Sequence, residues 1–331
     1  MYVATATQVC NAAAKMGCKG KFFSRFLAHR GLKSAERDWH HNVRRLIQRP
    51  FGADSDLLRT YMVSFPLLHP TRDEIVDEML PILLPWQVAQ ALRAASKLVG
   101  PLLHADGTAF NARYWNAVKG CSWALKHDIW SVPLPQREFC CPLMLFCDEI
   151  KFFKGSGKDV CFYVYNWTTM GGHGATRGCK HWLFMVPGWR AVPATHAKAA
   201  SVCAWLLREL QKGIDSPDLR GYHGEVLPRL QQRAGPAHDL RFFFVAFKSD
   251  ASQKKVNHAY PECAQANAIC ELCPAHKTTA AYNFADVDVT ANWARELRTH
   301  EDYLAACGAH PSPWCELPNW RAPHEHALYG I

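Results

Sequence analysis

Several features are absent from this chain of 331 residues, and each absence excludes a class of protein. The first residues contain no long apolar run, so a secretory signal peptide is not expected. The most apolar window, 79–103, is interrupted by prolines, glutamines, Arg93 and Lys97, which a membrane-spanning helix rarely contains. The glycine motifs that hold nucleotide phosphates and the serine nucleophile elbow are also missing. We therefore expect an intracellular protein with no membrane partner and no nucleotide cofactor.

The composition is that of a folded protein with a moderately basic surface. Apolar residues make up 49% of the chain and charged residues 20%, which excludes global disorder and leaves ample material for a core. Without a signal peptide, the 14 cysteines are interpreted as intracellular thiols rather than as a disulfide framework. The net charge of +9 permits a polyanionic partner without requiring one. Basic residues between 15 and 33 form either a nuclear-localisation or nucleic-acid-binding arm or simply a solvated face.

Residues 1–135 are expected to be a helical N-terminal region. Apolar residues recur at three- and four-residue spacings through 73–103, and Pro81 and Pro85 divide this stretch into two helices. A third helix is predicted over 111–127. Prolines 133 and 135 then mark a linker.

Residues 142–256 are expected to form an α/β core. Short apolar runs predict strands over 143–147, 160–167, 181–187 and 241–247, and the segment 195–212 has the apolar face and end signals of a helix. The predicted order is therefore β-β-β-α-β, a mixed sheet with one helical crossover.

Two acids, Asp148 and Asp250, directly follow the first and fourth of these strands. If the two strands are parallel neighbours, both carboxylates emerge at the same edge of the sheet. Adjacent carboxylates repel each other unless a cation lies between them, and Mg²⁺ or Mn²⁺ prefers oxygen ligands of this kind. Such ions support attack on a phosphodiester. The alternative is that each acid only ends its strand.

A cluster of cysteines and histidines over 257–280 predicts a small zinc knuckle. Its centre is the CxxC pair Cys270 and Cys273, with Cys263 as a third thiolate and His258 or His276 as the fourth ligand. Four protein ligands leave no open position, so the zinc would be structural. Buried free thiols are the alternative interpretation.

Lysines and aromatic residues alternate around the predicted acid pair, a pattern that suits phosphate contact and base stacking. Ordinary solvated lysines would give the same pattern. The lysines predicted to contact nucleic acid are Lys151, Lys154, Lys248, Lys254 and Lys255.

The strand order and the two acids, in the stretches LFCDEIKFF and FKSD, resemble the ribonuclease H-like fold of the DDE/D transposases and integrases. The knuckle after the second acid, the element Glu36-Arg37-Asp38 and the pair Tyr114-Trp115 are similar to mobile-element proteins that are abundant in dinoflagellate genomes. The resemblance implies metal-dependent DNA cleavage or strand transfer in the nucleus, with DNA and further copies of the chain as partners.

A site of this type also needs a third acid in the segment 281–331. We place Glu301, on a helix expected from residue 290, ahead of the other acids there. Related elements end with Asp-x-x-His, whereas Pro323 occupies the aspartate position three residues before His326. The chain is therefore expected to be either an active nuclease or a truncated, inactive copy. The alternatives are a non-catalytic, zinc-stabilised nucleic-acid-binding or interaction module, and an unrelated metal-dependent hydrolase that uses the histidines.

Overall fold

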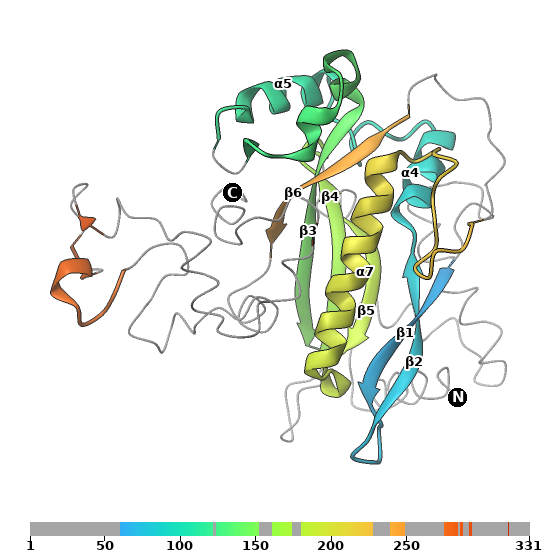
Figure 1. Cartoon of the computed structure of the whole chain (residues 1–331), viewed down its shortest axis with the longest axis vertical. Coiled ribbons are helices and arrows are strands. Elements are labelled where there is room, and N and C mark those ends of the chain that lie inside the picture. The colour runs from blue at the N-terminus through green and yellow to red at the C-terminus, as the bar shows by residue number, and fades with distance from the viewer. Residues whose placement is uncertain are drawn as a thin grey trace, which may run out of the picture.

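The computed structural model describes most of the chain between residues 60 and 248 and short pieces beyond it. The described residues are 60–121, 124–151, 161–173, 180–227, 239–248, 275–283, 285–286, 291–292 and 317. They form a mixed α/β structure with a four-stranded sheet and a separate two-stranded hairpin (Figure 1). No helix among these residues is long and apolar enough to cross a membrane.

The four-stranded sheet confirms the predicted strand order. Its strands are β3 (Cys140–Lys151), β4 (Cys161–Thr169), β5 (His181–Pro187) and β6 (Arg241–Lys248). They lie in the order β5-β4-β3-β6, with β3 antiparallel to β4, β4 antiparallel to β5, and β3 parallel to β6. The first and fourth strands of the predicted core are therefore parallel neighbours, which is the condition for their following acids to share one edge of the sheet.

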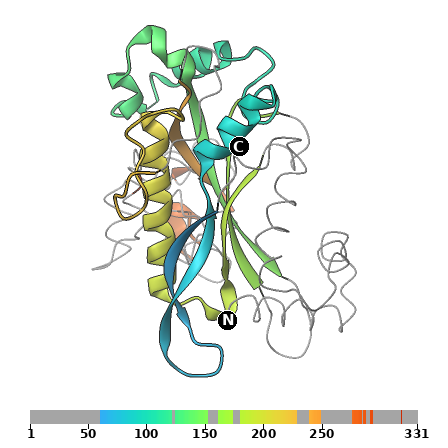
Figure 2. The ribbon, with the colours of Figure 1, turned by 90° about the vertical axis from the view of Figure 1, so that its right-hand side faces the viewer.

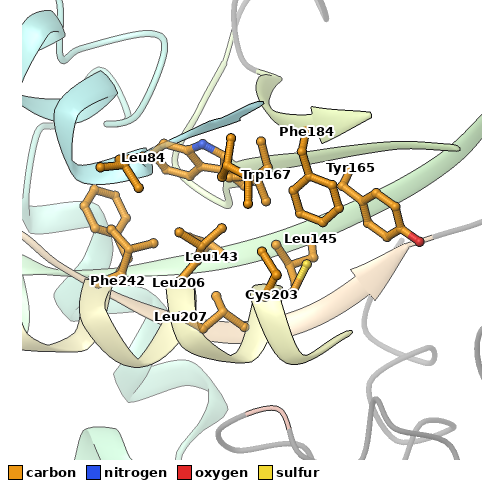
Figure 3. Packing of buried hydrophobic residues seen from close by; sticks show 14 of the residues in the cluster. Leu84, Leu143, Leu145, Tyr165, Trp167, Phe184, Cys203, Leu206, Leu207 and Phe242 are labelled. Carbon is orange, nitrogen blue, oxygen red and sulfur yellow. The ribbon is translucent and has the colours of Figure 1, made fainter. Parts of the chain in front are cut away.

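The helical crossover between β5 and β6 is α7 (Pro193–Lys212), and it covers one face of the sheet (Figures 1 and 2). Pro193 starts the helix, and the Thr195 hydroxyl accepts a hydrogen bond from the Val192 amide at 2.9 Å. Leu206 and Leu207 pack into a core with odd-numbered residues of β3, including Leu143 and Leu145 (Figure 3). The face of the sheet under α7 is therefore covered by an apolar core.

The opposite face of the sheet is covered only in part by described residues. Helix α5 (Ala109–Val118) and the short helices η3 (Asp128–Ser131) and η4 (Leu134–Phe139) pack over the beginnings of β3 and β6. Trp115 is buried there and donates a hydrogen bond from Nε1 to the Cys140 carbonyl at 2.7 Å. On β3 this second core reaches Met144. The remaining even-numbered positions of β3, from Phe146 onward, lie beyond it.

The expected helix at 73–84 is wrong, because this segment belongs to an antiparallel hairpin. Its strands are β1 (Thr60–Leu68) and β2 (Ile75–Leu83), joined by residues 69–74. Ile75 and Met79 are 59% and 46% exposed, so the apolar residues that suggested a helical stripe do not share one buried face. The true signal is the alternation of buried Val63, Phe65 and Leu67 on β1. The hairpin packs against β5 and α7.

Two of the predicted N-terminal helices are present with different bounds. Helix α4 (Pro85–Ala94) starts at the predicted proline break. Helix α5 ends at Val118, earlier than the expected end at residue 127. Residues 1–59 lie outside the described part, so the helical character of the first segment stays a prediction.

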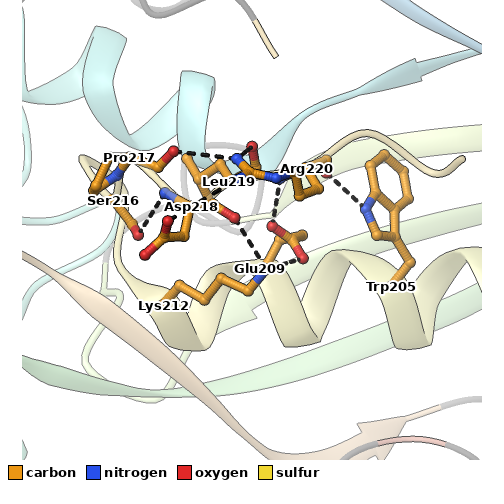
Figure 4. Close-up of polar contacts among 8 residues, drawn as sticks. All are labelled: Trp205, Glu209, Lys212, Ser216, Pro217, Asp218, Leu219 and Arg220. Atoms are coloured by element: carbon orange, nitrogen blue, oxygen red, sulfur yellow. Dashed lines mark hydrogen bonds and ion pairs between the residues drawn. The ribbon is translucent and has the colours of Figure 1, made fainter. Parts of the chain in front are cut away.

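The connection after α7 is held to the helix by a buried carboxylate. Glu209 is 5% exposed and accepts a hydrogen bond from the Arg220 amide at 2.7 Å (Figure 4). The Lys212 ammonium contacts the other oxygen of the same carboxylate. The Trp205 indole donates to the Arg220 carbonyl at 3.0 Å. These contacts fold the loop 213–227 back along α7.

Candidate metal and nucleic-acid site

The pairing of β3 with β6 sets the spacing of the two predicted acids. At the start of the ladder, Cys140 pairs with Arg241, so the partners are 101 residues apart. The register shifts between Leu143 and Met144, and at the last described pair, Phe146 with Lys248, the partners are 102 residues apart. Asp148 and Asp250 are also separated by 102 residues, and each follows this last pair by two positions.

The register shift is a β-bulge in which β6 carries one extra residue, Val245. Phe244 and Phe247 both belong to the core under α7, whereas Val245 and Ala246 both belong to the opposite core. Val245 and Ala246 therefore face the same side of the sheet. After the bulge, paired residues of β3 and β6 again point to the same face.

Asp148 is an exposed side chain on the face of the sheet that α7 does not cover. Its neighbours Cys147 and Leu145 point into the core under α7, so the even-numbered Asp148 lies on the other face with Met144 and Phe146. Its partner on β4 is Val164, which is 1% exposed. A carboxylate in this position is accessible to a cation, while its backbone is paired with β4.

The other predicted members of the site lie outside the described residues. These are the acids Asp250 and Glu301, the zinc ligands His258, Cys263, Cys270 and Cys273, and the lysines Lys154, Lys254 and Lys255. Lys151 and Lys248 end β3 and β6, but their side chains also lie outside the described part. The ribonuclease H-like fold, the magnesium site and the zinc knuckle therefore stay predictions.

His276 is the one predicted zinc ligand in the described residues. Its Nδ1 accepts hydrogen bonds from the backbone amides of Thr278 and Thr279, each at 3.2 Å. These bonds assign the proton of the neutral ring to Nε2. A zinc-bound Nε2 would instead require the proton on Nδ1. Zinc at Nε2 of His276 would therefore require both hydrogen bonds to break.

Three other histidines use Nδ1 in the same way. His69, His104 and His127 each accept a hydrogen bond from the backbone amide two residues later, at 3.1–3.3 Å. These imidazoles stabilise turns, much as aspartate or asparagine side chains do. Within the described ranges there is also no group of three or more His, Cys, Asp or Glu side chains placed to hold a metal ion. The described histidines therefore give no support to a histidine-based hydrolase.

The six described cysteines are free thiols. Cys147, Cys161 and Cys203 are buried and belong to the core of the sheet. Burial raises the pKa of the Cys203 thiol well above its usual value, so this side chain is unreactive.

Two residues that were not predicted lie on the same face as Asp148. They are Lys180, just before β5, and Trp182 within it. The segment HWLFMVP is apolar almost throughout, so the sequence carries no signal that separates its two faces. Their position follows only from the sheet register.

Comparisons of the chain with protein-family models, with curated proteins and with solved structures find no match.

Proposed function

We propose that the chain is a metal-dependent nuclease or strand transferase of the transposase and integrase type, acting on DNA. The observation that carries this proposal is the bulged register between β3 and β6. Its 102-residue offset is also the sequence separation of Asp148 and Asp250, which is the separation that two acids at equivalent positions along these strands require.

Paired positions on neighbouring strands are about 5 Å apart and their side chains lie on the same face. Two carboxylates at this distance repel each other, and a divalent cation between them removes the repulsion. The exposure of Asp148 supports this role, because an exposed carboxylate is accessible to a cation. The proposed third ligand is Glu301.

In this proposal the chain supplies the carboxylates and fixes their positions on the sheet. When bound, the divalent ions would activate a water or a DNA hydroxyl and stabilise the leaving oxygen. The sheet is well suited to position the ligands because Asp148 belongs to a strand that is hydrogen-bonded on both sides.

The test is a nicking assay on supercoiled plasmid with the purified chain. We expect cleavage with Mg²⁺ or Mn²⁺ and none with EDTA. Asp148→Asn should abolish cleavage, because it removes an anionic ligand without changing the side-chain size. The matched control is Glu149→Gln, which makes the same change one residue along the strand, on the opposite face.

A second measurement separates metal binding from catalysis. Titration with Mn²⁺, followed by calorimetry, should show weaker binding for Asp148→Asn and for Asp250→Asn. The losses should not add in the double variant, because both acids hold the same ion. Cleavage that survives Asp148→Asn would overturn the assignment. Metal-independent DNA binding without cleavage would favour the non-catalytic alternative.

A further inference from the structure

One face of the hairpin formed by β1 and β2 carries exposed apolar side chains. Ile75 and Met79 of β2 are 59% and 46% exposed, and Asp77 between them is exposed as well. These alternate positions lie on one face of the strand, whereas Glu78 and Ile82, on the other face, are buried. The hairpin therefore packs against β5 and α7 with one face and leaves the other accessible.

Residues of β1 complete this accessible face. Leu68 pairs with Ile75, Ser64 pairs with Met79, and paired residues point to the same side of a sheet. Both β1 residues are half-buried. The turn of the hairpin projects beyond the first turn of α7 (Figures 1 and 2). We define the outer hairpin face as Ser64, Pro66, Leu68, Ile75, Asp77 and Met79.

The exposed part of β2 and the residues before it are acidic, although the chain as a whole has a net charge of +9. Asp73, Glu74 and Asp77 are exposed carboxylates. Arg72 is exposed beside them and is paired with Glu74 at 3.2 Å. The charge that remains on this strand is therefore negative, and a segment that fits the outer hairpin face is both apolar and positively charged.

We propose that the outer hairpin face is the docking site for the N-terminal segment 15–33 of the same chain. This segment lies outside the described residues, and its sequence has the required composition. Its apolar residues include Phe22, Phe23, Phe26 and Leu27. No acid offsets its positive charge, because the first acidic residue of the chain is Glu36. The basic residues of the segment are Lys15, Lys19, Lys21, Arg25, Arg30 and Lys33.

The connection between the segment and the hairpin is long enough for this contact. Thr60 begins β1 and pairs with Leu83, at the end of the hairpin away from its turn. Ile75 lies at the other end of β2, about 27 Å from Leu83 at the rise of a strand. Residues 34–59 would span about 39 Å as a continuous helix, and more when extended. The segment 15–33 can therefore reach every part of the outer hairpin face.

The size of the outer hairpin face favours a segment of the same chain over a second copy. Strands of nine residues are about 30 Å long, and a pair of strands is roughly 10 Å wide, which gives roughly 300 Å². Stable complexes between separate proteins bury about 800 Å² on each partner. A tethered segment needs a smaller contact, because its effective concentration at the site is high.

The test is photo-crosslinking in the full chain with p-benzoylphenylalanine in place of Met79. We expect the crosslinked peptides, identified by mass spectrometry, to come from residues 15–33. A mixture of light and ¹⁵N-labelled chains distinguishes contacts within one chain from contacts between two. The matched control carries the crosslinker in place of Leu134 of η4, which is 69% exposed, and should not select this segment.

A charge reversal tests the electrostatic part of the contact. In the chain with the crosslinker at position 79, Asp77→Lys should lower the yield of crosslinks to 15–33 by about 1.4- to 5-fold for each ion pair lost. The matched control is Asp218→Lys, which makes the same change in the loop 213–227 at a side chain that is 76% exposed. This control should leave the yield unchanged.

Each other outcome would overturn the inference. Crosslinks between light and labelled chains would show that a second copy occupies the face. Crosslinks from position 79 that are spread over the chain, as from position 134, would show that the face has no preferred occupant. An equal effect of Asp77→Lys and Asp218→Lys would remove the role of the acidic strand. The inference is independent of the proposed nuclease, since crosslinking requires no DNA and no metal ion.

Discussion

Arg190 and Glu78 form a buried ion pair that fastens the hairpin to the main sheet. Arg190 lies in η5 (Gly188–Arg190), directly after β5, and Glu78 lies on β2. They are 4% and 6% exposed, and the Arg190 Nη1 lies 2.7 Å from the Glu78 Oε2. The Arg190 Nε also donates to the Leu68 carbonyl of β1 at 2.6 Å. One guanidinium therefore contacts both strands of the hairpin.

Removing one partner of this pair is expected to destabilise the fold. Arg190→Met would leave the Glu78 carboxylate buried without a counter-charge, which costs roughly 3–5 kcal/mol of unfolding free energy. Urea denaturation at pH 7 measures the change. The double variant Arg190→Met, Glu78→Leu should recover much of the loss, because neither charge remains.

The control for this prediction is the exposed pair Arg72 and Glu74, whose side chains are 71% and 47% exposed. Arg72→Met should cost less than about 1 kcal/mol, since solvent screens the pair. A similarly small effect of Arg190→Met would contradict the buried geometry.

His181 is expected to make the stability depend on pH. Burial lowers its pKa from 6.5 to about 4. Between these two values the unfolded chain binds a proton that the folded chain does not, so stability is complete above pH 6.5 and falls as the pH is lowered toward 4. The contribution of this one residue is on the order of 3 kcal/mol.

The comparison with His181→Phe isolates this contribution. Phenylalanine keeps the ring contact with Trp167 but does not titrate and loses the hydrogen bond to the Pro101 carbonyl. Unfolding free energies of both proteins should be measured from pH 7 to pH 4.5. The variant should lose less stability than the parent over this range. Parallel curves would show that His181 is solvated when folded.

The strands and crossover of the main sheet were predictable because each carries a strong local signal. Continuous apolar runs define β3 and β6, and Thr195 and Gly213 lie close to the ends of α7, which begins two residues earlier than predicted, at Pro193. The one helical crossover implies that β6 runs parallel to β5 and β3, whereas its pairing with β3 comes only from the structure.

The hairpin was not predicted because the spacing of its apolar residues fits both a helix and a strand. Ile75, Met79 and Ile82 match a helical spacing, and Pro81 was interpreted as a helix break although it pairs with Met62 in the ladder. Local spacing does not decide between the two, because the burial of β1 and β2 depends on β5 and α7.

The β-bulges next to the candidate site could also not be predicted from the sequence. In RFFFVAFK both faces of β6 are apolar, so nothing marks Val245 as the extra residue. The two acids could be proposed as a pair from their positions after strands. The register of β3 with β6, and the position of Trp182 on β5, could be derived only from the assembled sheet.

The predicted zinc knuckle can be tested by the metal content of the purified chain. The purified chain should contain about one zinc ion, and Cys270→Ser combined with Cys273→Ser should remove it, because two of four ligands are lost. Cys121→Ser, at a half-buried free thiol, is the matched control and should keep the metal. His258→Asn should lower zinc content more than His276→Asn. Zinc retained by the double cysteine variant would exclude the knuckle.

Gly213 is predicted to be required for the turn that ends α7. It has a φ of +113°, and an added Cβ would lie 1.9 Å from the Asp239 Oδ2. Gly213→Ala therefore combines backbone strain with a steric clash and should cost about 1–3 kcal/mol in urea denaturation. Gly107→Ala isolates the strain, since Gly107 has a φ of +63° with no atom within 4 Å of its Cβ position. Gly120→Ala meets neither problem and should be close to neutral. If all three variants lose the same stability, the clash with Asp239 does not exist in solution.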